Sequence, residues 1–494
     1  MRTFVFLSAL FCAGQANAQQ ISLSGRPSQG GSVNVTQTAV PGTTSSVNTL
    51  NTTVQVQGPY QGSARSGQPF SGTLPLREAV ARGLEYNLGT VGVNAAMRQA
   101  DGQTRVARSV LLPNLNGGLR ETVQQSNLRA LGLRISSPFP GAAIPSIVGP
   151  FNYFDLRATL TQKLADMNAL SNYRSAKEVA RANMFNAQDA RDLVVLAVGG
   201  AYLQVIASQA RVASARVQLA TANALYQQTF DRKQSGLVAQ IDVNRSQVQR
   251  QTQQQRLSTL ENDLAKQKIN LARLTGLPPN PDYAVSDDVP FAAPPLLTPD
   301  EAIARALATR ADLKAASAQV SSATHLRSAA RAERLPALDV SADYGVIGTN
   351  PSQAHGTFTV TGSLRFPIWQ GGRTEGDIAQ AEAALYQRRA ELQDIRGKIE
   401  SDVRSALLDM DAAASQVELS KNNQALARQT VDLSRQRLDA GITDTVELVQ
   451  AQEAVATADL DYITSLFAHN LAKLSLARAL GQAAENLDQF LKLR

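Results

Sequence analysis

The sequence of 494 residues predicts a mainly helical protein with a smaller membrane β part, built from two copies of one helix–hairpin–long helix–helix unit. Three observations predict this fold class. Several short segments alternate strictly between apolar and polar residues, which is the period of a strand with two unlike faces. Two much longer stretches keep a helical apolar period, and the two halves of the chain repeat the same landmarks in the same order.

The clearest strand begins the segment 358–385, where the chain changes from one period to the other. Even-numbered positions from Phe358 to Phe366 are apolar or glycine, and the odd-numbered positions between them are Thr, Ser or Arg. Pro367 and the pair Gly371-Gly372 end this strand, and a helical period follows. A strand with an apolar outer face that leads into a very long helix is explained if the strand faces lipid and the helix stands in water.

Three further segments show the same alternation, namely Leu115–Val123, Phe154–Thr161 and Leu338–Val346. Each strand has roughly 10 residues, the length of a barrel strand that crosses a bilayer. The alternative is an amphipathic sheet on a soluble domain, but that sheet would need an apolar layer to cover it, and no spare segment provides one. We therefore predict four lipid-facing strands, joined in pairs by a long loop at 124–152 and a short loop at 347–357.

Four strands cannot close a barrel, because bacterial outer-membrane barrels need at least about 8 and lipid does not tolerate open sheet edges. Several copies of the chain must therefore share one wall. Two copies would give about 8 strands and three would give about 12. Strand counting leaves both assemblies open.

The long helices are predicted at Asp166–Ser235 and Gly372–Ala440. Each would span roughly 100 Å at 1.5 Å per residue. Shorter helices of roughly 36 and 33 residues are expected to stack end to end along each long one. The first short helix of each half ends at a Leu-Pro, and the returning helix ends at Gly276 or Gly481.

The repeated landmarks set the domain boundaries. Leu74–Asn87 resembles Leu297–Arg310, and the Gly turns at Gly236 and Gly441 occupy matching places. The predicted segments are a signal peptide at 1–18, a leader at 19–72, a first repeat at 73–280, a linker at 281–296, a second repeat at 297–481 and a C-terminal tail at 482–494.

The signal peptide is predicted from a basic start, a short apolar run and an A-x-A cleavage site at 16–18. The leader is rich in Ser, Thr, Gly, Gln and Asn, so we expect it to be disordered or loosely attached. The alternative is a short Thr/Val strand at 48–56. No apolar run approaches the length expected of a membrane-spanning helix, which leaves a barrel as the way to span a membrane.

The composition argues against most chemistry. Cys12 is the single cysteine and leaves with the signal peptide, so no disulfide or thiolate site is expected. The formal charge of +7 is spread along the chain, which does not favour nucleic-acid binding. No nucleotide-binding or nucleophile motif occurs, and none of the three histidines has a ligand partner at metal spacing. We therefore predict a protein that is not an enzyme, with no catalytic residue, no cofactor and no metal site.

The sequence resembles the TolC family of outer-membrane efflux proteins between Thr73 and Gly481. The resemblance rests on LLPNL at 111–115, FPIWQGGRTEGDIAQAEAAL at 366–385, GLVAQIDV at 236–243 and AGITDTVELVQAQ at 440–452. It implies a homotrimer in which a 12-stranded β-barrel stands in the outer-membrane lipid on a 12-helix α-barrel tunnel in the periplasm. It also implies an exit duct for efflux or type I secretion, coupled through a periplasmic adaptor to an inner-membrane transporter.

The resemblance places the functional residues at the helical tips. Gly236 and Leu237, with Gly441 and Ile442, match the tips that adaptors contact. Asp242 and Glu447 match acids of the periplasmic gate, whereas Gln450 and Thr443 stand where a second acid and an arginine can occur. The alternative for Asp242 and Glu447 is that they are ordinary helix N-terminal acids, which complement the helix dipole.

Two other interpretations stay open at this stage. A periplasmic coiled-coil adaptor or structural protein would also carry helical hairpins and strands, although it would lack a full duplication with lipid-like strands. Trp369 follows an apolar strand and is suited to a membrane interface, but a core tryptophan is an almost equal alternative.

Overall fold

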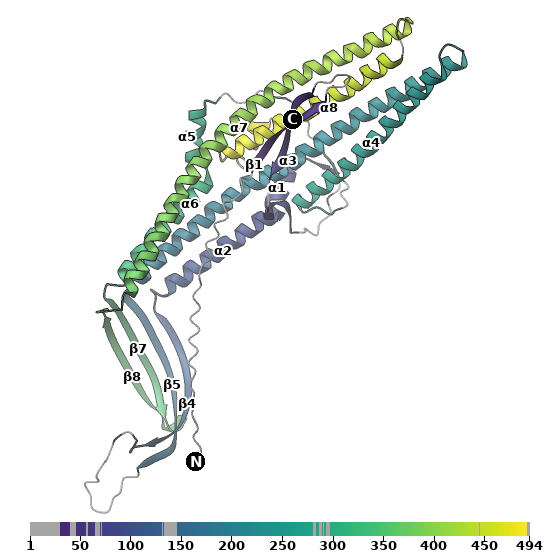
Figure 1. Ribbon diagram of the computed structural model, residues 1–494. Coiled ribbons are helices and arrows are strands. Elements are labelled where there is room, and N and C mark those ends of the chain that lie inside the picture. Colours follow the sequence, from purple (N-terminus) through teal and green to yellow (C-terminus); the bar gives the residue numbers. More distant parts are fainter. Residues whose placement is uncertain are drawn as a thin grey trace, which may run out of the picture.

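The computed structural model describes residues 30–39, 46–55, 58–64, 70, 72–130, 132, 146–279, 283–285, 289, 291–292, 297–443 and 445–491. The predicted signal peptide at 1–18 and most of the predicted linker at 281–296 lie outside these residues. The chain forms a tall body of long helices with a sheet at one end (Figure 1).

Two units of matching elements build the body. The first contains α1 (Leu76–Tyr86), α2 (Leu88–Ser109), β4 (Asn114–Asn127), β5 (Ile147–Ala165), α3 (Met167–Gln234) and α4 (Gln240–Thr275). The second contains α5 (Pro299–Thr309), α6 (Ala311–Ala332), β7 (Ala337–Gly348), β8 (His355–Arg365), α7 (Arg373–Asp439) and α8 (Thr445–Ala479). α1 and α5 both have 11 residues, and α2 and α6 both have 22. The duplication predicted from the sequence is therefore present in the fold.

Smaller elements lie outside the two units. They are the strands β1 (Gly30–Ala39), β2 (Ser46–Gln55), β3 (Gly72–Leu74) and β6 (Tyr283–Val285), the 3-10 turns Gly58–Gln61 and Pro351–Gln353, and the helix α9 (Leu487–Leu491). β1 and β2 pair with each other as an antiparallel hairpin that lies beside α8. β3 and β6 form a short parallel pair.

The structure corrects the prediction for the leader, residues 19–72. Residues 30–39 and 46–55 are strands, so the expectation of a disordered or loosely attached segment is wrong for them, and the alternative strand at 48–56 is close to β2. The two strands pair with each other over ten residues and lie against α8, so local pairing and contact with a helix order a segment that has few large apolar residues.

The first short helix of each unit is also different from the prediction. We expected one helix of roughly 36 residues, whereas the structure breaks it at Asn87 and, in the second unit, at Arg310. Asn87 takes extended backbone (φ −62°, ψ 133°), and its side chain accepts a hydrogen bond from the Gly89 N–H (2.9 Å). The asparagine thus ends one helix and caps the next.

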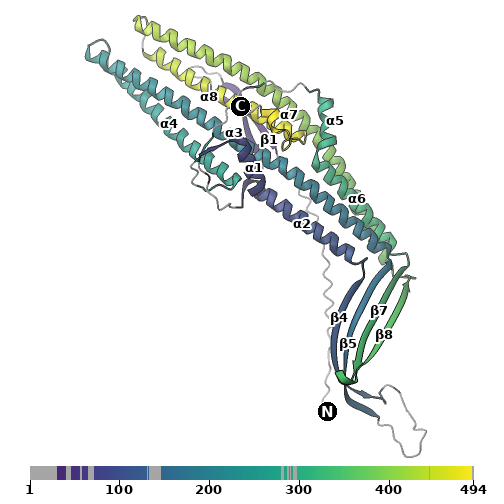
Figure 2. The ribbon, with the colours of Figure 1, turned by 180° about the vertical axis from the view of Figure 1, so that it is seen from behind.

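The long helices carry the rest of the body. α3 and α7 run its full height, with α2 and α4 along α3 and with α6 and α8 along α7 (Figures 1 and 2). The main core lies midway along the body, where apolar residues of α3 between Val194 and Ala207 pack against α8 between Phe467 and Ala477. A second core joins α5, α7 and α8.

Within the described residues, one helix is long and apolar enough to cross a membrane by length and composition, although the sequence predicted no such run. This stretch belongs to α3, and 78% of it is buried inside the protein. Its apolar residues form the main core, where Leu196 and Val198 are fully buried. The stretch is therefore a core segment whose partners are other helices of the same chain.

The four predicted membrane strands form one antiparallel sheet in the order β4-β5-β7-β8. Their register aligns the apolar positions of all four strands on the same face. One row across the sheet contains Leu115, Leu160, Ala342 and Val360, and another contains Leu119, Leu156, Val346 and Gly356. On the opposite face, Arg157 pairs with Asp155 (3.2 Å) and Asp343 (2.5 Å) across β5 and β7. The sheet therefore has one mostly apolar face, which Glu121 and Gln162 interrupt, and one polar, charged face.

Candidate functional site at the helical tips

The end of the body opposite the sheet consists of two helical turns with the same backbone. Gly236 (φ 70°) follows α3, and Gly441 (φ 72°) follows α7. In the first turn, the N–H groups of Gly236 and Leu237 donate to the carbonyl oxygens of Lys233 and Arg232, both at 2.9 Å. This double closure is a Schellman motif, which needs a left-handed residue, and glycine adopts that conformation without strain.

The second turn repeats this motif. The N–H groups of Gly441 and Ile442 donate to the carbonyl oxygens of Leu438 (3.1 Å) and Arg437 (2.9 Å). Leu237 and Ile442 follow the two glycines, and they are 74% and 69% exposed. Each predicted adaptor-contacting pair therefore consists of a glycine that shapes the turn and an aliphatic side chain that points into solvent.

Ion pairs and hydrogen bonds join the two tips. Arg232 at the end of α3 pairs with Asp439 at the end of α7 (3.0 Å). Asp242 lies in the first turn of α4 and accepts a hydrogen bond from the Thr445 hydroxyl at the start of α8 (3.1 Å). Asp242 also lies 3.6 Å from Arg245 on its own helix. The first predicted gate acid therefore connects the two helical hairpins within one chain.

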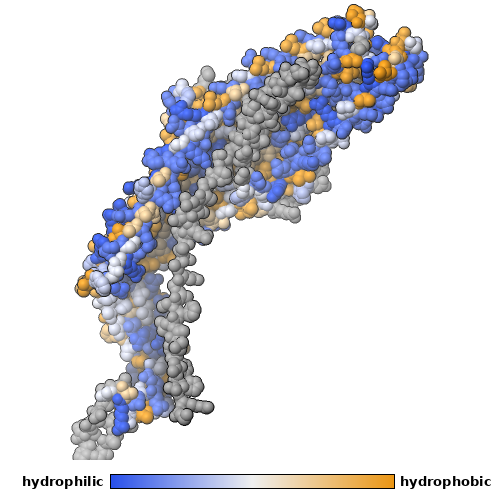
Figure 3. Space-filling view, in the orientation of Figure 1, coloured by the Kyte–Doolittle hydropathy of each residue, from blue (hydrophilic) through white to orange (hydrophobic). Residues whose placement is uncertain are grey.

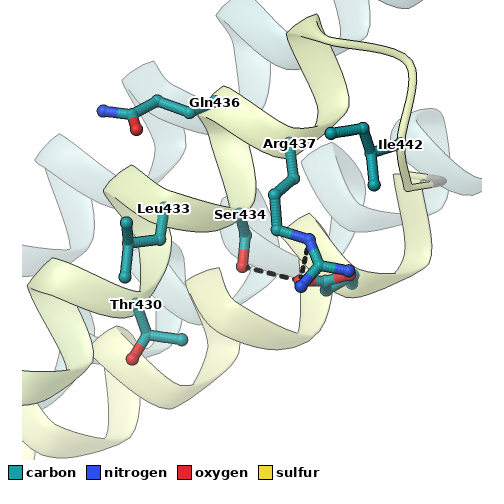
Figure 4. A pocket seen from close by; sticks show the side chains of 7 residues that line it. Thr430, Leu433, Ser434, Gln436, Arg437 and Ile442 are labelled. Carbon is teal, nitrogen blue, oxygen red and sulfur yellow. Dashed lines mark hydrogen bonds and ion pairs between the residues drawn. The ribbon is translucent and has the colours of Figure 1, made fainter.

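Glu447, the second predicted gate acid, lies in the first turn of α8 at the edge of a groove. Its carboxylate accepts hydrogen bonds from the hydroxyls of Thr443 (2.5 Å) and Ser434 (3.4 Å), and it lies 3.6 Å from the Arg437 guanidinium. Figure 4 shows Ser434 and Arg437 converging on this acid from α7. The groove has a volume of about 550 Å³, and Leu433 and Ile442 add apolar surface to it.

Gln450 and Thr443 have different surroundings. Gln450 is exposed on α8, one turn beyond Glu447. The Thr443 hydroxyl donates to Glu447, so this position holds a neutral donor beside the second predicted gate acid. The structure thus brings Asp242 and Thr445 together, and Glu447 and Thr443 together, while Gln450 lies apart from these bonds.

Sequence reasoning missed the two arginines of the tips. Arg232 and Arg437 each stand four residues before the glycine of their turn, so the duplication itself could have pointed to them. Each lies in the last turn of a long helix, where a cation complements the helix dipole. Arg232 then crosses to the other hairpin, whereas Arg437 turns to Glu447.

Two more acids of α8 hold the hairpins together farther from the tips. Glu453 accepts hydrogen bonds from Gln249 (2.6 Å) and Gln253 (3.1 Å) of α4, and both glutamines are buried. Asp459 accepts from Ser214 of α3 (3.0 Å) and pairs with Arg428 of α7 (3.1 Å). Polar contacts between the two hairpins therefore continue beyond the predicted gate residues.

Comparison with known proteins gives a consistent result across most of the chain. The family model described as outer membrane efflux protein matches residues 92–277 and 302–482, one segment in each unit. The chain is 24% identical over 424 residues to the pyoverdine export outer membrane protein OpmQ of Pseudomonas putida, with 81% of this chain and 84% of that protein covered. It is 26% identical over 439 residues to the outer membrane protein OprJ of Pseudomonas aeruginosa, with 82% and 84% covered.

Solved structures share the fold. The outer membrane channel CmeC of Campylobacter jejuni superimposes with a TM-score of 0.72 at 16% identity, covering 84% of this chain and 89% of that chain. The outer membrane protein VceC of Vibrio cholerae gives 0.69 at 18% identity, covering 83% and 97%. The predicted combination of long helices with a terminal sheet is therefore confirmed.

Proposed function

The chain belongs to the outer membrane efflux protein family, and we propose from this premise that three copies assemble into one channel that joins a periplasmic adaptor and an inner-membrane pump. As a member of the family, the protein lies in the outer membrane with its helical part in the periplasm, and it acts as an exit duct for efflux. The family is one of transport ducts, so the adaptor alternative raised by the sequence is set aside.

The observation that carries the proposal is the four-stranded sheet with one mostly apolar face. Its outer strands are β4 and β8, and each pairs along one side only within the described residues. Exposed strand edges are not tolerated in lipid, so β8 of one copy would pair with β4 of the next. Three copies then supply about 12 strands, within the range of known outer-membrane barrels.

The helices support the same assembly. In each copy α2 and α4 pack along α3, and α6 and α8 pack along α7, so each long helix has one shorter neighbour toward the sheet and one toward the tips (Figure 2). Three copies would therefore place twelve helices around one axis, the same number as the strands above them. Each strand of the barrel can then continue into one helix of the periplasmic tunnel, so the two parts form one channel wall.

Cysteine cross-linking tests this assembly. Cys12 is the single cysteine and lies in the predicted signal peptide, so the rest of the chain is a cysteine-free background. Asn116→Cys in β4 would be combined in turn with Thr357→Cys, Thr359→Cys, Thr361→Cys and Ser363→Cys in β8, because all five positions lie on the polar face. Oxidation in intact membranes should give a ladder of bands that ends at the trimer for at least one pair.

The matched control is Ser341→Cys with Thr361→Cys, which are direct partners within one chain and should leave a monomer band. A ladder that ends at the dimer would contradict the trimer. If every β4–β8 pair closed within a monomer, the sharing of one wall between copies would be wrong.

For the tips, we propose that Gly236, Leu237, Gly441 and Ile442 form the adaptor contact and that Asp242, Glu447 and Gln450 form the periplasmic gate. Leu237 and Ile442 supply exposed apolar anchors of the kind that often dominate protein–protein binding when they are buried. The double substitution Leu237→Asp, Ile442→Asp should abolish capture of the adaptor in cells and abolish efflux, with trimer formation unchanged. Leu419→Asp, on an exposed position of α7 far from the tips, is the matched control and should keep both activities.

A further inference from the structure

The polar face of the four-stranded sheet carries charges of both signs. The register places four basic and three acidic residues on this face. The basic residues are Arg120, Arg157, Lys163 and Arg365, and the acidic residues are Asp155, Asp339 and Asp343. Of the Arg, Lys, Asp and Glu residues in these four described strands, Glu121 alone lies on the apolar face. The face that would line a pore therefore mixes charges instead of gathering those of one sign.

Arg157 lies at the centre of this charge pattern. Its guanidinium pairs with Asp155 on its own strand (3.2 Å) and with Asp343 on β7 (2.5 Å). The three side chains are between 21% and 32% exposed, so they are in contact with solvent but packed against the sheet. Arg120 lies opposite Asp155 in the register of β4 and β5. Two acids and two bases therefore meet in one patch of the face.

The remaining bases of the polar face also lie beside acids. Lys163 pairs with Asp166, which follows β5 and caps α3 (2.6 Å). Arg365 lies 3.8 Å from Asp339 across β7 and β8. With Asp166 included, the four bases are matched by four acids, so the formal charge of the face is zero.

We propose that the polar face lines a charge-balanced lumen, which does not select cargo by the sign of its charge, and that Arg157 sets this balance. The inference rests on the proposed function, because it requires the apolar face of the sheet to lie in lipid and the polar face to surround a water-filled pore. It makes Arg157 the residue of the barrel that determines which charges the lumen accepts.

The physical reason is the difference between a ring of like charges and a ring of pairs. Pores become selective when rings of side chains of one sign focus the field along the axis. Opposite charges in contact produce a field that falls off steeply, and salt screens what remains within about 10 Å at 0.1 M. Repeating a balanced face around the axis of the trimer would therefore add no net field. Removal of Arg157 would leave one net negative charge in each copy.

The alternative is that Arg157 only ties β5 to β7 as a structural clamp. A clamp depends on contact between the side chains, whereas the balance depends on the total charge of the face. The double variant Arg157→Gln, Asp343→Asn separates the two roles, because it breaks the ion pairs but returns the total charge to that of the parent. Only the balance predicts that this variant recovers the behaviour of the parent lumen.

The charge that a solute meets in the lumen can be measured from the reactivity of one cysteine. Thr359→Cys lies on β8 opposite Asp343, at an exposed position of the polar face. Cys12, in the predicted signal peptide, is the single cysteine of the sequence. The full-length protein in outer-membrane vesicles would react with a positively or a negatively charged methanethiosulfonate, and each rate would be divided by that for free cysteine. The ratio of the two rates cancels any change in the thiol itself.

We expect a ratio of positive to negative reagent within about twofold of 1 for Thr359→Cys alone, because the surrounding charges are balanced. Adding Arg157→Gln should raise the ratio about threefold, since a unit charge roughly 7 Å away in water changes the energy of a singly charged reagent by about the thermal energy before screening. Asp343→Asn should lower the ratio about as much, and the double variant should come close to the parent value. Arg157→Lys keeps the charge and should change the ratio little.

Two controls use the opposite face of the sheet. Glu121→Gln removes one charge from the apolar face and should leave the ratio at Thr359→Cys unchanged. Val360→Cys, tested in place of Thr359→Cys, lies on the apolar face and should react with neither reagent, because these ions do not enter lipid. Reaction at Val360→Cys would mean that this face is in water, and it would overturn the channel together with the balanced lumen.

The inference fails alone if Thr359→Cys reacts, Val360→Cys does not, and the charges behave otherwise. A parent ratio far from 1, or a ratio that neither Arg157→Gln nor Asp343→Asn changes, would overturn the balanced lumen and leave the channel intact. A double variant that keeps the ratio of Arg157→Gln would also overturn it. Should Arg157→Gln give no trimer in membranes, Asp343→Asn alone decides the question, because it leaves Arg157 paired with Asp155.

Discussion

At mid-height, buried charged side chains join the end of α8, in the second unit, to α3, the first long helix. Arg478 of α8 pairs with Asp189 of α3 at 2.5 Å, and both side chains are buried. Asp192, one turn farther along α3, accepts a hydrogen bond from the Ala484 N–H (2.8 Å) after α8. Burial raises the pKa of Asp192 to about 6, although Arg478 and the Ala484 N–H act in the opposite direction. The acid is therefore held in the fold at an energetic cost when it is charged.

The substitution Asp192→Asn should stabilise the protein at neutral and alkaline pH. The pKa of the folded state lies above the ordinary value of 3.8, so the contribution of Asp192 to stability is fully present below pH 3.8 and is lost as pH rises through about 6. Asparagine keeps an oxygen for the Ala484 N–H and carries no charge. The gain at pH 8 should be at most about 3 kcal/mol, with little change at pH 4.

The measurement is the thermal unfolding midpoint of the detergent-solubilised protein at several pH values. Asp411→Asn, at an exposed position of α7, is the control and should show no such pH-dependent gain. A variant that is less stable than the parent at pH 8 would mean that the attraction between Asp192 and Arg478 outweighs the burial of the charge.

In both units, the glycine that ends the returning helix packs against the break in the first short helix. Gly276, which ends α4, packs against Tyr86 at the break between α1 and α2, and Gly481, which ends the second unit, packs against Arg310 at the break between α5 and α6. Near the second contact, the Thr309 hydroxyl donates to the Leu480 carbonyl (2.6 Å). Each unit therefore closes on itself where its returning helix ends.

This arrangement predicts unequal effects of the same substitution. Gly236, Gly276, Gly441 and Gly481 all have positive φ. Substitution by alanine should therefore lower the free energy of unfolding by about 1 kcal/mol at each position through backbone strain. A Cβ at Gly236 or Gly441 would meet nothing within 4 Å, whereas at Gly276 it would lie 2.8 Å from the Tyr86 Cβ and at Gly481 it would lie 3.0 Å from the Arg310 Cα. Gly276→Ala and Gly481→Ala should therefore lower the unfolding midpoint clearly more than the two tip variants do. Equal losses at all four positions would contradict this.

The strands, the glycine turns and the helix breaks differ in how far the sequence could predict them. The alternation from Phe358 to Phe366 and the glycines that end the helices are local signals, and the strands and turns were predicted from them. The break at Arg310 is not a local signal, because arginine is a good helix former. There the backbone is held by a guanidinium that pairs with Asp312 (2.6 Å) and with Asp402 of α7 (3.0 Å), a residue distant in the sequence.

The pairing of the tips could be predicted only in part for the same reason. Asp242 and Glu447 were predicted as acids after a glycine turn, but each also has a partner on another helix. Thr445 reaches Asp242 across the two hairpins, and Arg437 reaches Glu447 across the α7–α8 turn. These contacts depend on how the hairpins lie beside each other, which no periodicity in the sequence specifies.

At the scale of the whole molecule, both ends carry the surfaces that an assembly would cover. The sheet end presents a mostly apolar face, and the opposite end presents Leu237 and Ile442 with polar links between hairpins. Between them the helical body is largely hydrophilic on its visible face (Figure 3). This distribution suits the proposed assembly, in which the sheet end would contact lipid and the tips would contact the adaptor.

The gate prediction also belongs to this scale, because it depends on threefold repetition. In the proposed trimer, three copies of Glu447 would surround one axis, and their negative charges would attract cations there. Arg437 lies 3.6 Å from this acid and offsets part of that charge. Glu447→Gln should therefore weaken block of the channel by multivalent cations, and Arg437→Gln should strengthen it.

Single-channel recordings in planar bilayers, with a trivalent cation added on the periplasmic side, measure both effects. The double variant Glu447→Gln, Arg437→Gln should bind the cation about as weakly as Glu447→Gln alone, because the arginine acts only through the acid it neutralises. Raised salt should reduce the difference between the parent and each variant, since the field of partly exposed charges is screened within about 10 Å at 0.1 M. Currents that stay the same in all three variants would remove Glu447 from the gate and leave it as a helix N-terminal acid beside Thr443.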